Sequence, residues 1–200
     1  MSDYRERIRE YIRQEAKPVD KFGHQPRLYA LTRKIGKDLS YDDDVVFAAA
    51  WLHDLGVFIG HRPEEPRALA AWDNTAYAME KAPQVLADTG FPAAKERAVV
   101  EAIRTHQPNN APTSLEGAIL RDADILEQLG AIAVMRGVCK IGRDTRFADF
   151  TSVVVVLRRA LATLPQQLRL EPARMLAKER ISLLESFLTG LDAEADGELY

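Results

Sequence analysis

The sequence predicts an all-α fold, a compact helical bundle, and three observations lead to this prediction. Apolar residues recur at helical spacing along most of the chain, glycine and proline separate the helical segments, and the strict alternation typical of half-buried strands is rare. With 200 residues, of which 46% are hydrophobic, the chain is long enough to bury a sizeable core. Because we find no internal repeat, linker or shift in composition, we expect one domain over residues 1–200.

Three helices are expected in the first quarter of the chain. The first spans about Asp3 to Ala16 and stops before Pro18, because the residue preceding proline is pushed out of the α region. The second begins near Pro26, which suits a first helical turn, and it places His24 at its start. The third opens with the aspartates at 42–44, which can cap free N–H groups, and ends at Gly56.

The rest of the chain continues the helical pattern. A loop over 57–66 precedes expected helices over about 68–88 and 92–105, and a second loop covers 106–113. Thr113 and Glu116 have the spacing of a capping box that opens the next helix. The valines at 153–156 are also expected in a helix, because the following LRRALATL restores the helical period. We expect the C-terminal helices to cover about residues 147–192.

Composition excludes several classes of function. A net charge of −3 and a pI near 5.9 argue against a broad nucleic-acid-binding surface. No stretch of about 18 consecutive apolar residues occurs, so we expect no membrane span and a cytoplasmic location. The single cysteine, Cys139, is expected to be a small buried hydrophobe without a catalytic role.

The clearest chemical signal is the pair His53-Asp54 inside the apolar segment AAWLHDLG. Burial of a carboxylate requires a compensating partner, and a metal ion satisfies an imidazole and a carboxylate together. The other histidines, His24, His61 and His106, also fall at predicted helix ends or in nearby loops. The sequence therefore indicates a metal site at the end of the third helix.

A second acidic element, RDADILEQLG, carries Asp122 and Asp124 in an apolar environment. Residues two apart on a helix cannot face the same point, so we expect one side chain to point inward and the other to point outward or to cap. An inward aspartate could be a metal ligand, or it could pair with an arginine in the core. Spacing alone leaves both interpretations open.

The ordered set of His24, His53-Asp54 and a later Asp124 resembles the HD-domain superfamily of metal-dependent phosphohydrolases. DDDVVFAAAWLHDLG is similar to the central helix of that superfamily, and RDADILEQLGAIAVMRG is similar to a segment of its small stand-alone bacterial members. The likeness covers about residues 20–140. It implies an HD-like helical bundle that holds a metal with His24, His53, Asp54 and Asp124. It also implies hydrolysis of a phosphate ester or anhydride, with a nucleotide as the expected substrate and a nucleotidase or nucleotide pyrophosphohydrolase as the expected type.

Two imidazoles and two carboxylates leave coordination positions for water and a substrate oxygen. This donor set suits Mn²⁺, Mg²⁺, Co²⁺, Ni²⁺ or Fe²⁺, and the sequence does not decide among them. Such a metal activates water and polarises a phosphoryl oxygen, and Asp54 is expected to orient the attacking water as well as to bind the metal.

Further side chains are candidates for roles around the expected metal. Candidates to bind the phosphate are Lys21, Arg27 and Arg62, of which Arg27 has the best geometric case because it follows His24 by three residues. His106 is either a substrate contact, a general acid or an ordinary helix-end histidine. His61 is expected to be solvated. Outer hydrogen bonds to the ligands are expected from Glu127 and Gln128.

Two other functions stay open at this point. One is a non-catalytic HD module that binds a nucleotide or a protein. The other is a di-iron oxygenase of the same superfamily, which needs further histidines between the His-Asp pair and the last aspartate; only His61 and His106 are available. The expected partner is a small phosphate-bearing molecule, without nucleic acid or membrane, and the sequence leaves a homo-oligomer open.

Overall fold

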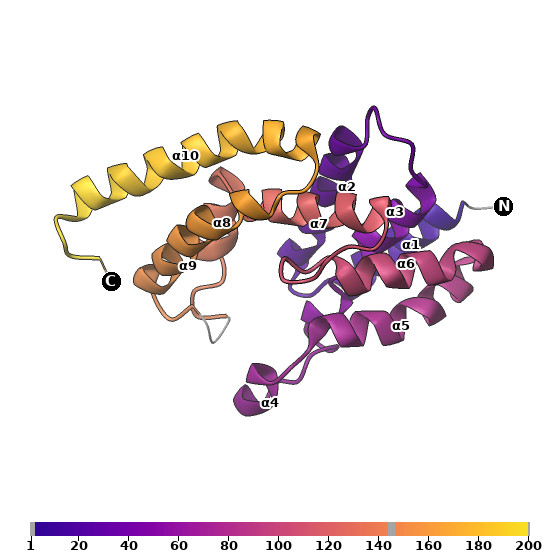
Figure 1. Cartoon of the computed structure of the whole chain (residues 1–200). Coiled ribbons are helices and arrows are strands. Elements are labelled where there is room, and N and C mark those ends of the chain that lie inside the picture. The colour runs from indigo at the N-terminus through magenta and orange to yellow at the C-terminus, as the bar shows by residue number, and fades with distance from the viewer. Residues whose placement is uncertain (1–2, 144–146, 200) are drawn as a thin grey trace. The chain divides into compact units, whose positions relative to one another are not determined.

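Ten α-helices form the described part of the chain, residues 3–143 and 147–199, in this computed structural model (Figure 1). Within these residues no β-strand forms, and one isolated bridge joins Ile59 and Arg62. The predicted all-helical fold is confirmed. The chain divides into two compact units, Met1–Ala123 and Asp124–Tyr200, and the boundary falls inside one helix. None of the described helices is both long and apolar enough to cross a membrane.

The first unit is built around the helix that precedes the His53-Asp54 pair. Its helices are α1 (Tyr4–Glu15), α2 (His24–Ile35), α3 (Asp43–Leu52), α4 (Pro66–Ala70), α5 (Asn74–Thr89), α6 (Ala93–Thr105) and the greater part of α7 (Leu115–Glu127). Helix α3 contacts α1, α2 and α6, while α5 and α6 lie side by side (Figure 1). Every residue of α3 from Val45 to Leu52 is buried, as its small and apolar sequence predicts.

Helix α3 has a polar start and a buried end. The carboxylate of Asp42 accepts hydrogen bonds from the backbone N–H groups of Asp44 and Val45, at 3.0 and 3.4 Å, and so caps the helix. The helix ends at Leu52, with His53 as its C-terminal cap, and a short 3₁₀ turn follows over Leu55–Val57. The end therefore comes earlier than the expected Gly56. Consequently both members of the His53-Asp54 pair lie where regular backbone stops.

Two sequence predictions for this unit are wrong. The expected helix over 68–88 is two helices, because the carboxylate of Asp73 caps a new start and accepts from the Ala76 N–H at 2.9 Å. The expected capping box does not form at the start of α7. Ser114, which directly precedes the helix, accepts instead from the Gly117 N–H at 3.0 Å, and Glu116 accepts from the Asp42 N–H at 2.9 Å.

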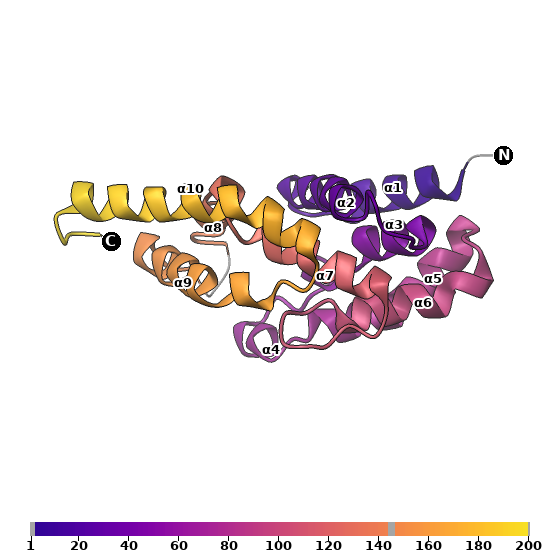
Figure 2. The same cartoon turned by 45° about the horizontal axis from the view of Figure 1, so that its top comes forward.

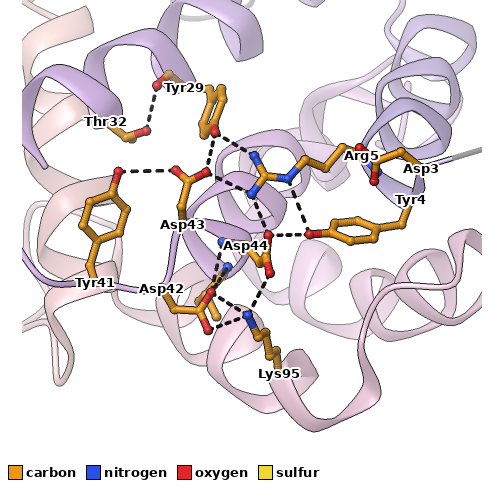
Figure 3. A network of polar contacts seen from close by, with 11 residues as sticks. Asp3, Tyr4, Arg5, Tyr29, Thr32, Tyr41, Asp42, Asp43, Asp44 and Lys95 are labelled. Carbon is orange, nitrogen blue, oxygen red and sulfur yellow. Dashed lines mark hydrogen bonds and ion pairs between the residues drawn. The ribbon is translucent and has the colours of Figure 1, made fainter. Parts of the chain in front are cut away.

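A network of polar side chains ties the start of α3 to α1 and α6 (Figure 3). The Arg5 guanidinium donates to Asp43 and Asp44 at 2.9 and 2.6 Å, and the Lys95 ammonium donates to Asp44 at 2.8 Å. Tyr4 also donates to Asp44. Burial alone would raise the pKa of Asp44, but the hydrogen bonds from Arg5, Lys95 and Tyr4 outweigh burial and hold that pKa well below its usual range.

Removing Arg5 from this network is expected to lower the free energy of unfolding in a pH-dependent way. A carboxyl whose pKa is lowered by folding stabilises the protein above its unfolded pKa, about 3.9 for aspartate, and loses that contribution as the pH falls below it. Arg5→Met should therefore cost about 1–2 kcal/mol at pH 7, after allowance for partial exposure, and less near pH 3. Urea unfolding at both pH values measures this, with Arg33→Met on the exposed face of α2 as the control. An equal loss for both variants would contradict the prediction.

The second unit contains α8 (Ala131–Val138), α9 (Phe150–Thr163) and α10 (Glu171–Ala195), and α10 contacts both α8 and α9 (Figure 2). The valines at 153–156 are helical, as predicted, and Asp149 with Ser152 forms a capping box at the start of α9. Cys139 is exposed, so the prediction of a buried cysteine is wrong. The sequence pattern predicted a buried helical face that includes this cysteine. Helix α8 ends at Val138, however, and Cys139 is its C-terminal cap.

Candidate metal centre

The geometry of the candidate centre starts from His53 at the end of α3. Its side chain is 1% exposed, and its Nδ1 lies 3.0 Å from the carbonyl oxygen of Ala50. A carbonyl oxygen can only accept, so in the neutral imidazole Nδ1 carries the proton and Nε2 presents a lone pair. Histidines that bind metals are commonly oriented by such a carbonyl.

His24 and Asp54 meet His53 at this lone pair. His24 is the first residue of α2 and is buried, and its Nε2 lies 3.3 Å from the Nε2 of His53. The two carboxylate oxygens of Asp54 lie 3.6 Å from these nitrogens, one oxygen near each imidazole. Three polar side chains from two helix ends therefore converge on one point.

The donor atoms fit a divalent metal ion. Imidazole nitrogens lie about 2.1 Å from an ion such as zinc, so two of them at angles of about 90–109° are about 3.0–3.4 Å apart. The separation of 3.3 Å between His24 and His53 falls in that interval. Asp124, in the last turn of α7, offers a carboxylate oxygen within 4.8 Å of ligand atoms of both histidines. Two imidazoles with nearby carboxylates are a donor set suited to a divalent ion.

The two aspartates of α7 have different surroundings, as their spacing predicts. Asp122 is fully buried, and one of its oxygens lies 3.4 Å from the guanidinium of Arg121, so Asp122 pairs with an arginine. Asp124 accepts a hydrogen bond at 3.1 Å from the amide of Gln128, one turn further along the chain. Gln128 thus makes the outer contact expected of it. Its neighbour Glu127 lies 3.5 Å from Arg136.

His106 borders the same centre. It caps the C-terminal end of α6 and is 1% exposed, and its ring centre lies 5.0 Å from that of His53. Its Nδ1 donates to the carbonyl oxygen of Ile103 at 2.5 Å, and its Nε2 lies 3.2 Å from the amide nitrogen of Gln107. The structure therefore brings His106 beside the metal-ligand candidates, as a side chain with a fixed orientation.

His61 does not join this group, and the prediction that it is solvated is wrong. Its side chain is 9% exposed, and its Nε2 lies 2.6 Å from a carboxylate oxygen of Glu15 in α1. Its ring contacts those of Phe58 and Tyr77. Spacing could not reveal this pairing, because Glu15 lies 46 residues earlier in the sequence. His61 is thus tied to α1, which weakens the alternative of a di-iron oxygenase.

The three basic residues expected to bind phosphate lie on the segments that lead to the ligand candidates. Lys21 lies in the 3₁₀ turn Val19–Gly23, and Arg27 lies in the first turn of α2. The guanidinium of Arg27 lies against Gly23, the residue before His24. Arg62 lies in the loop after the His53-Asp54 pair, and all three side chains are partly exposed. Their role in binding stays a prediction.

Three further residues near the centre were missed by sequence reasoning. Trp72 donates its indole N–H to the carbonyl oxygen of Gly56 at 2.8 Å, next to the His-Asp turn. Gln107 contacts His106, and Arg121 donates to the carbonyl oxygen of Pro108 at 2.8 Å. Only Gln107 had a signal in the sequence, its position beside a candidate histidine, whereas the other two contacts depend on tertiary structure.

The HD domain is the family whose model matches this chain, over residues 22–129, more than half of its length. The chain belongs to the HD-domain family. In this HD-domain protein the matched region contains all four proposed ligands. The family membership and the cluster of two histidines and an aspartate together support a metal-dependent hydrolase of this superfamily.

Solved structures show the same fold. YpgQ from Bacillus subtilis is 21% identical, with a TM-score of 0.73 over 97% of this chain and 96% of that one. An HD-superfamily hydrolase from Bacillus thuringiensis is 19% identical, with a TM-score of 0.69 over 98% and 97%. A protein from an uncultured Thermotogales bacterium, described as a predicted HD superfamily hydrolase, is 27% identical, with a TM-score of 0.61 over 96% and 90%. YpgQ has also been solved in complex with ADP. No curated protein matches the chain.

Proposed function

We propose that this HD-domain protein hydrolyses a phosphate ester or anhydride of a nucleotide at a divalent metal held by His24, His53, Asp54 and Asp124. The observation that carries the proposal is the pair of buried imidazole nitrogens 3.3 Å apart, with a carboxylate oxygen 3.6 Å from each. Buried imidazoles and a carboxylate arranged in this way are stabilised by a shared cation. A metal at this point supplies activation of water and polarisation of a phosphoryl oxygen.

The protein's own groups prepare the ligands and the substrate. The carbonyl oxygen of Ala50 fixes the ring of His53, and the amide of Gln128 holds one oxygen of Asp124. Asp54 lies beside both histidines, where it can bind the metal and accept a proton from the attacking water. His106, whose ring packs against His53, is positioned as a contact for the substrate.

A nucleotide is the proposed substrate for two reasons. The complex of YpgQ with ADP shows that a protein with this fold holds a nucleotide. The chain's DAD-containing segment also resembles that of small stand-alone HD hydrolases. Both nucleotidase and nucleotide pyrophosphohydrolase activity release phosphate or pyrophosphate, so one assay class covers both types.

The first experiment is metal analysis of the purified protein together with a release assay for phosphate and pyrophosphate. Nucleoside mono- and triphosphates and simple phosphate esters are tested with and without Mn²⁺, Mg²⁺, Co²⁺, Ni²⁺ and Fe²⁺. Stoichiometric metal and metal-dependent release support the proposal and name the substrate class. Bound nucleotide without release under any metal would instead support the non-catalytic binding module.

Arg27→Ala is expected mainly to raise KM for an anionic substrate, by about tenfold or more, with a smaller change in kcat. Arg27 lies in the first turn of α2 against the residue before His24, and an arginine binds phosphate oxygens through charge-assisted hydrogen bonds. Steady-state kinetics measure the change, and Arg33→Ala, on the exposed face of the same helix, is the control. Unchanged kcat and KM in Arg27→Ala would return this side chain to a solvated surface role.

A further inference from the structure

A cleft of about 450 Å³ lies in the first unit, and its lining includes Gln107, the residue that follows His106. Its volume is within the range of small-molecule sites, about 300–1,000 Å³. One wall comes from the start of α5 and the residues just before it, and the other comes from the end of α6 and the loop that follows. The residues that matter for its chemistry are Trp72, Thr75, Met79, Arg104, Gln107 and Asn110.

The first wall is attached to the turn that carries the His-Asp pair. Trp72 donates its indole N–H to the carbonyl oxygen of Gly56 at 2.8 Å, which fixes the plane of the ring. A Cβ atom at Gly56 would lie 2.5 Å from the carbonyl oxygen of Asn74, so the start of α5 packs directly on this turn. Only glycine permits that approach. The position of the wall is therefore set by the turn that follows the His53-Asp54 pair.

The second wall continues directly from His106. The side-chain amide nitrogen of Gln107 lies 3.2 Å from the Nε2 of His106 and 3.1 Å from the hydroxyl oxygen of Thr75 on the facing wall. An amide has two N–H groups, and these two contacts use both. Its carbonyl oxygen is then the atom that can accept a hydrogen bond from a ligand. Gln107 thus links the cleft to His106, which borders the candidate centre.

The positive charge on the cleft walls is compensated, so the cleft is not built for a phosphate. The guanidinium of Arg104 donates two hydrogen bonds to Glu101, at 2.8 and 2.7 Å. Hydrogen bonds from Arg104 and then Thr113 lower the pKa of Glu101 to about 2, so the carboxylate balances the guanidinium at neutral pH. Asp73, which also lines the cleft, is a negative group that caps α5. An uncharged ligand suits these walls better than an anion.

The remaining surface has the features of a site for a heterocyclic base. A half-buried indole with a fixed plane and the polarisable thioether of Met79 offer stacking surface, and the amides of Gln107 and Asn110 offer polar edges. Proteins bind bases by combining aromatic stacking with hydrogen bonds to the base edge. We propose that this cleft binds the base of the nucleotide whose phosphate lies at the metal centre. The inference rests on the proposed function for the phosphate, whereas the base site can be tested without it.

The test uses adenosine, which carries no phosphate, and the metal-free full-length protein. The chain has two tryptophans, of which Trp51 is buried in the core and Trp72 lines the cleft. We expect adenosine to shift the indole N–H resonance of Trp72 in a saturable way and to leave that of Trp51 in place. Trp72→Phe assigns the two signals. Ribose 5-phosphate, the matching probe without a base, is expected to leave both signals unchanged.

A matched pair of variants separates the cleft from the rest of α5. Met79→Arg places a long charged side chain in the cleft and should raise the Kd for adenosine by about tenfold or more, equivalent to about 1.4 kcal/mol. Glu80→Arg introduces the same side chain at the next, exposed position and should change the Kd by less than about twofold.

Three results would overturn the base site. The first is that adenosine, up to its solubility limit, leaves the Trp72 signal unshifted. The second is that ribose 5-phosphate alone shifts this signal. The third is that Met79→Arg and Glu80→Arg bind adenosine with equal affinity. Adenosine binding without any metal-dependent phosphate release would keep the base site and contradict the proposed hydrolysis. Metal-dependent phosphate release without adenosine binding would keep the proposed hydrolysis and contradict the base site.

Discussion

His53→Ala is expected to remove the bound metal and to lower turnover by more than about 100-fold. Removing only a hydrogen-bond partner of a metal ligand lowers metal affinity or activity by up to about 100-fold, and this variant removes the ligand itself. The variant loses the imidazole whose Nε2 lies 3.3 Å from that of His24 and 3.6 Å from Asp54. Because the residue caps the end of α3 rather than lying within it, alanine should leave the helical content largely intact. Metal content per chain, turnover and circular dichroism measure the three effects.

His61→Ala is the matched control for this variant. His61 is also a largely buried histidine in the first unit, but it contacts Glu15, Phe58 and Tyr77. Its removal should lower the free energy of unfolding and leave the metal content unchanged. Full activity with stoichiometric metal in His53→Ala would refute the metal assignment, and loss of metal in both variants would point to a general loss of structure.

The central helix and the position of the histidine-aspartate pair could be predicted because burial alone determines them. Small and apolar residues on all sides of 45–52 require neighbouring helices on all sides, and the structure provides α1, α2 and α6. Two polar side chains at the end of so apolar a helix then need a partner. The proline after His24 predicted its place at the start of the second helix, whereas its role as a ligand came from the resemblance to HD-domain proteins; it lies beside His53.

Features that depend on tertiary partners could not be predicted. Asp73 begins a new helix inside an alanine-rich segment that contains no glycine at the break, so the local pattern indicated one helix. His61 is buried by a pairing with Glu15 across 46 positions, and Trp72 is oriented by a backbone oxygen 16 positions away. Spacing rules describe neighbours within one element, and these contacts join different elements.

Asp124→Asn is expected to weaken metal binding strongly and to lower turnover by about 100-fold or more. An amide keeps the size of the side chain and removes the negative charge that a divalent ion requires from its oxygen ligands. Asp124 is the aspartate of α7 whose carboxylate lies within 4.8 Å of ligand atoms of His24 and His53. Titration of the metal-free protein with Mn²⁺, followed by the metal-dependent assay, measures both effects.

Asp122→Asn provides the opposite result two positions earlier on the same helix. Asp122 is fully buried beside Arg121, so the variant leaves a buried guanidinium with a weaker partner and should cost about 1–3 kcal/mol of stability. Its metal affinity should stay within about threefold of the parent protein, because the carboxylate faces the arginine. If Asp122→Asn lost the metal and Asp124→Asn kept it, the ligand would be Asp122. Positions two apart on a helix do not face the same point. That result would therefore mean that α7 lies two residues out of register at the centre.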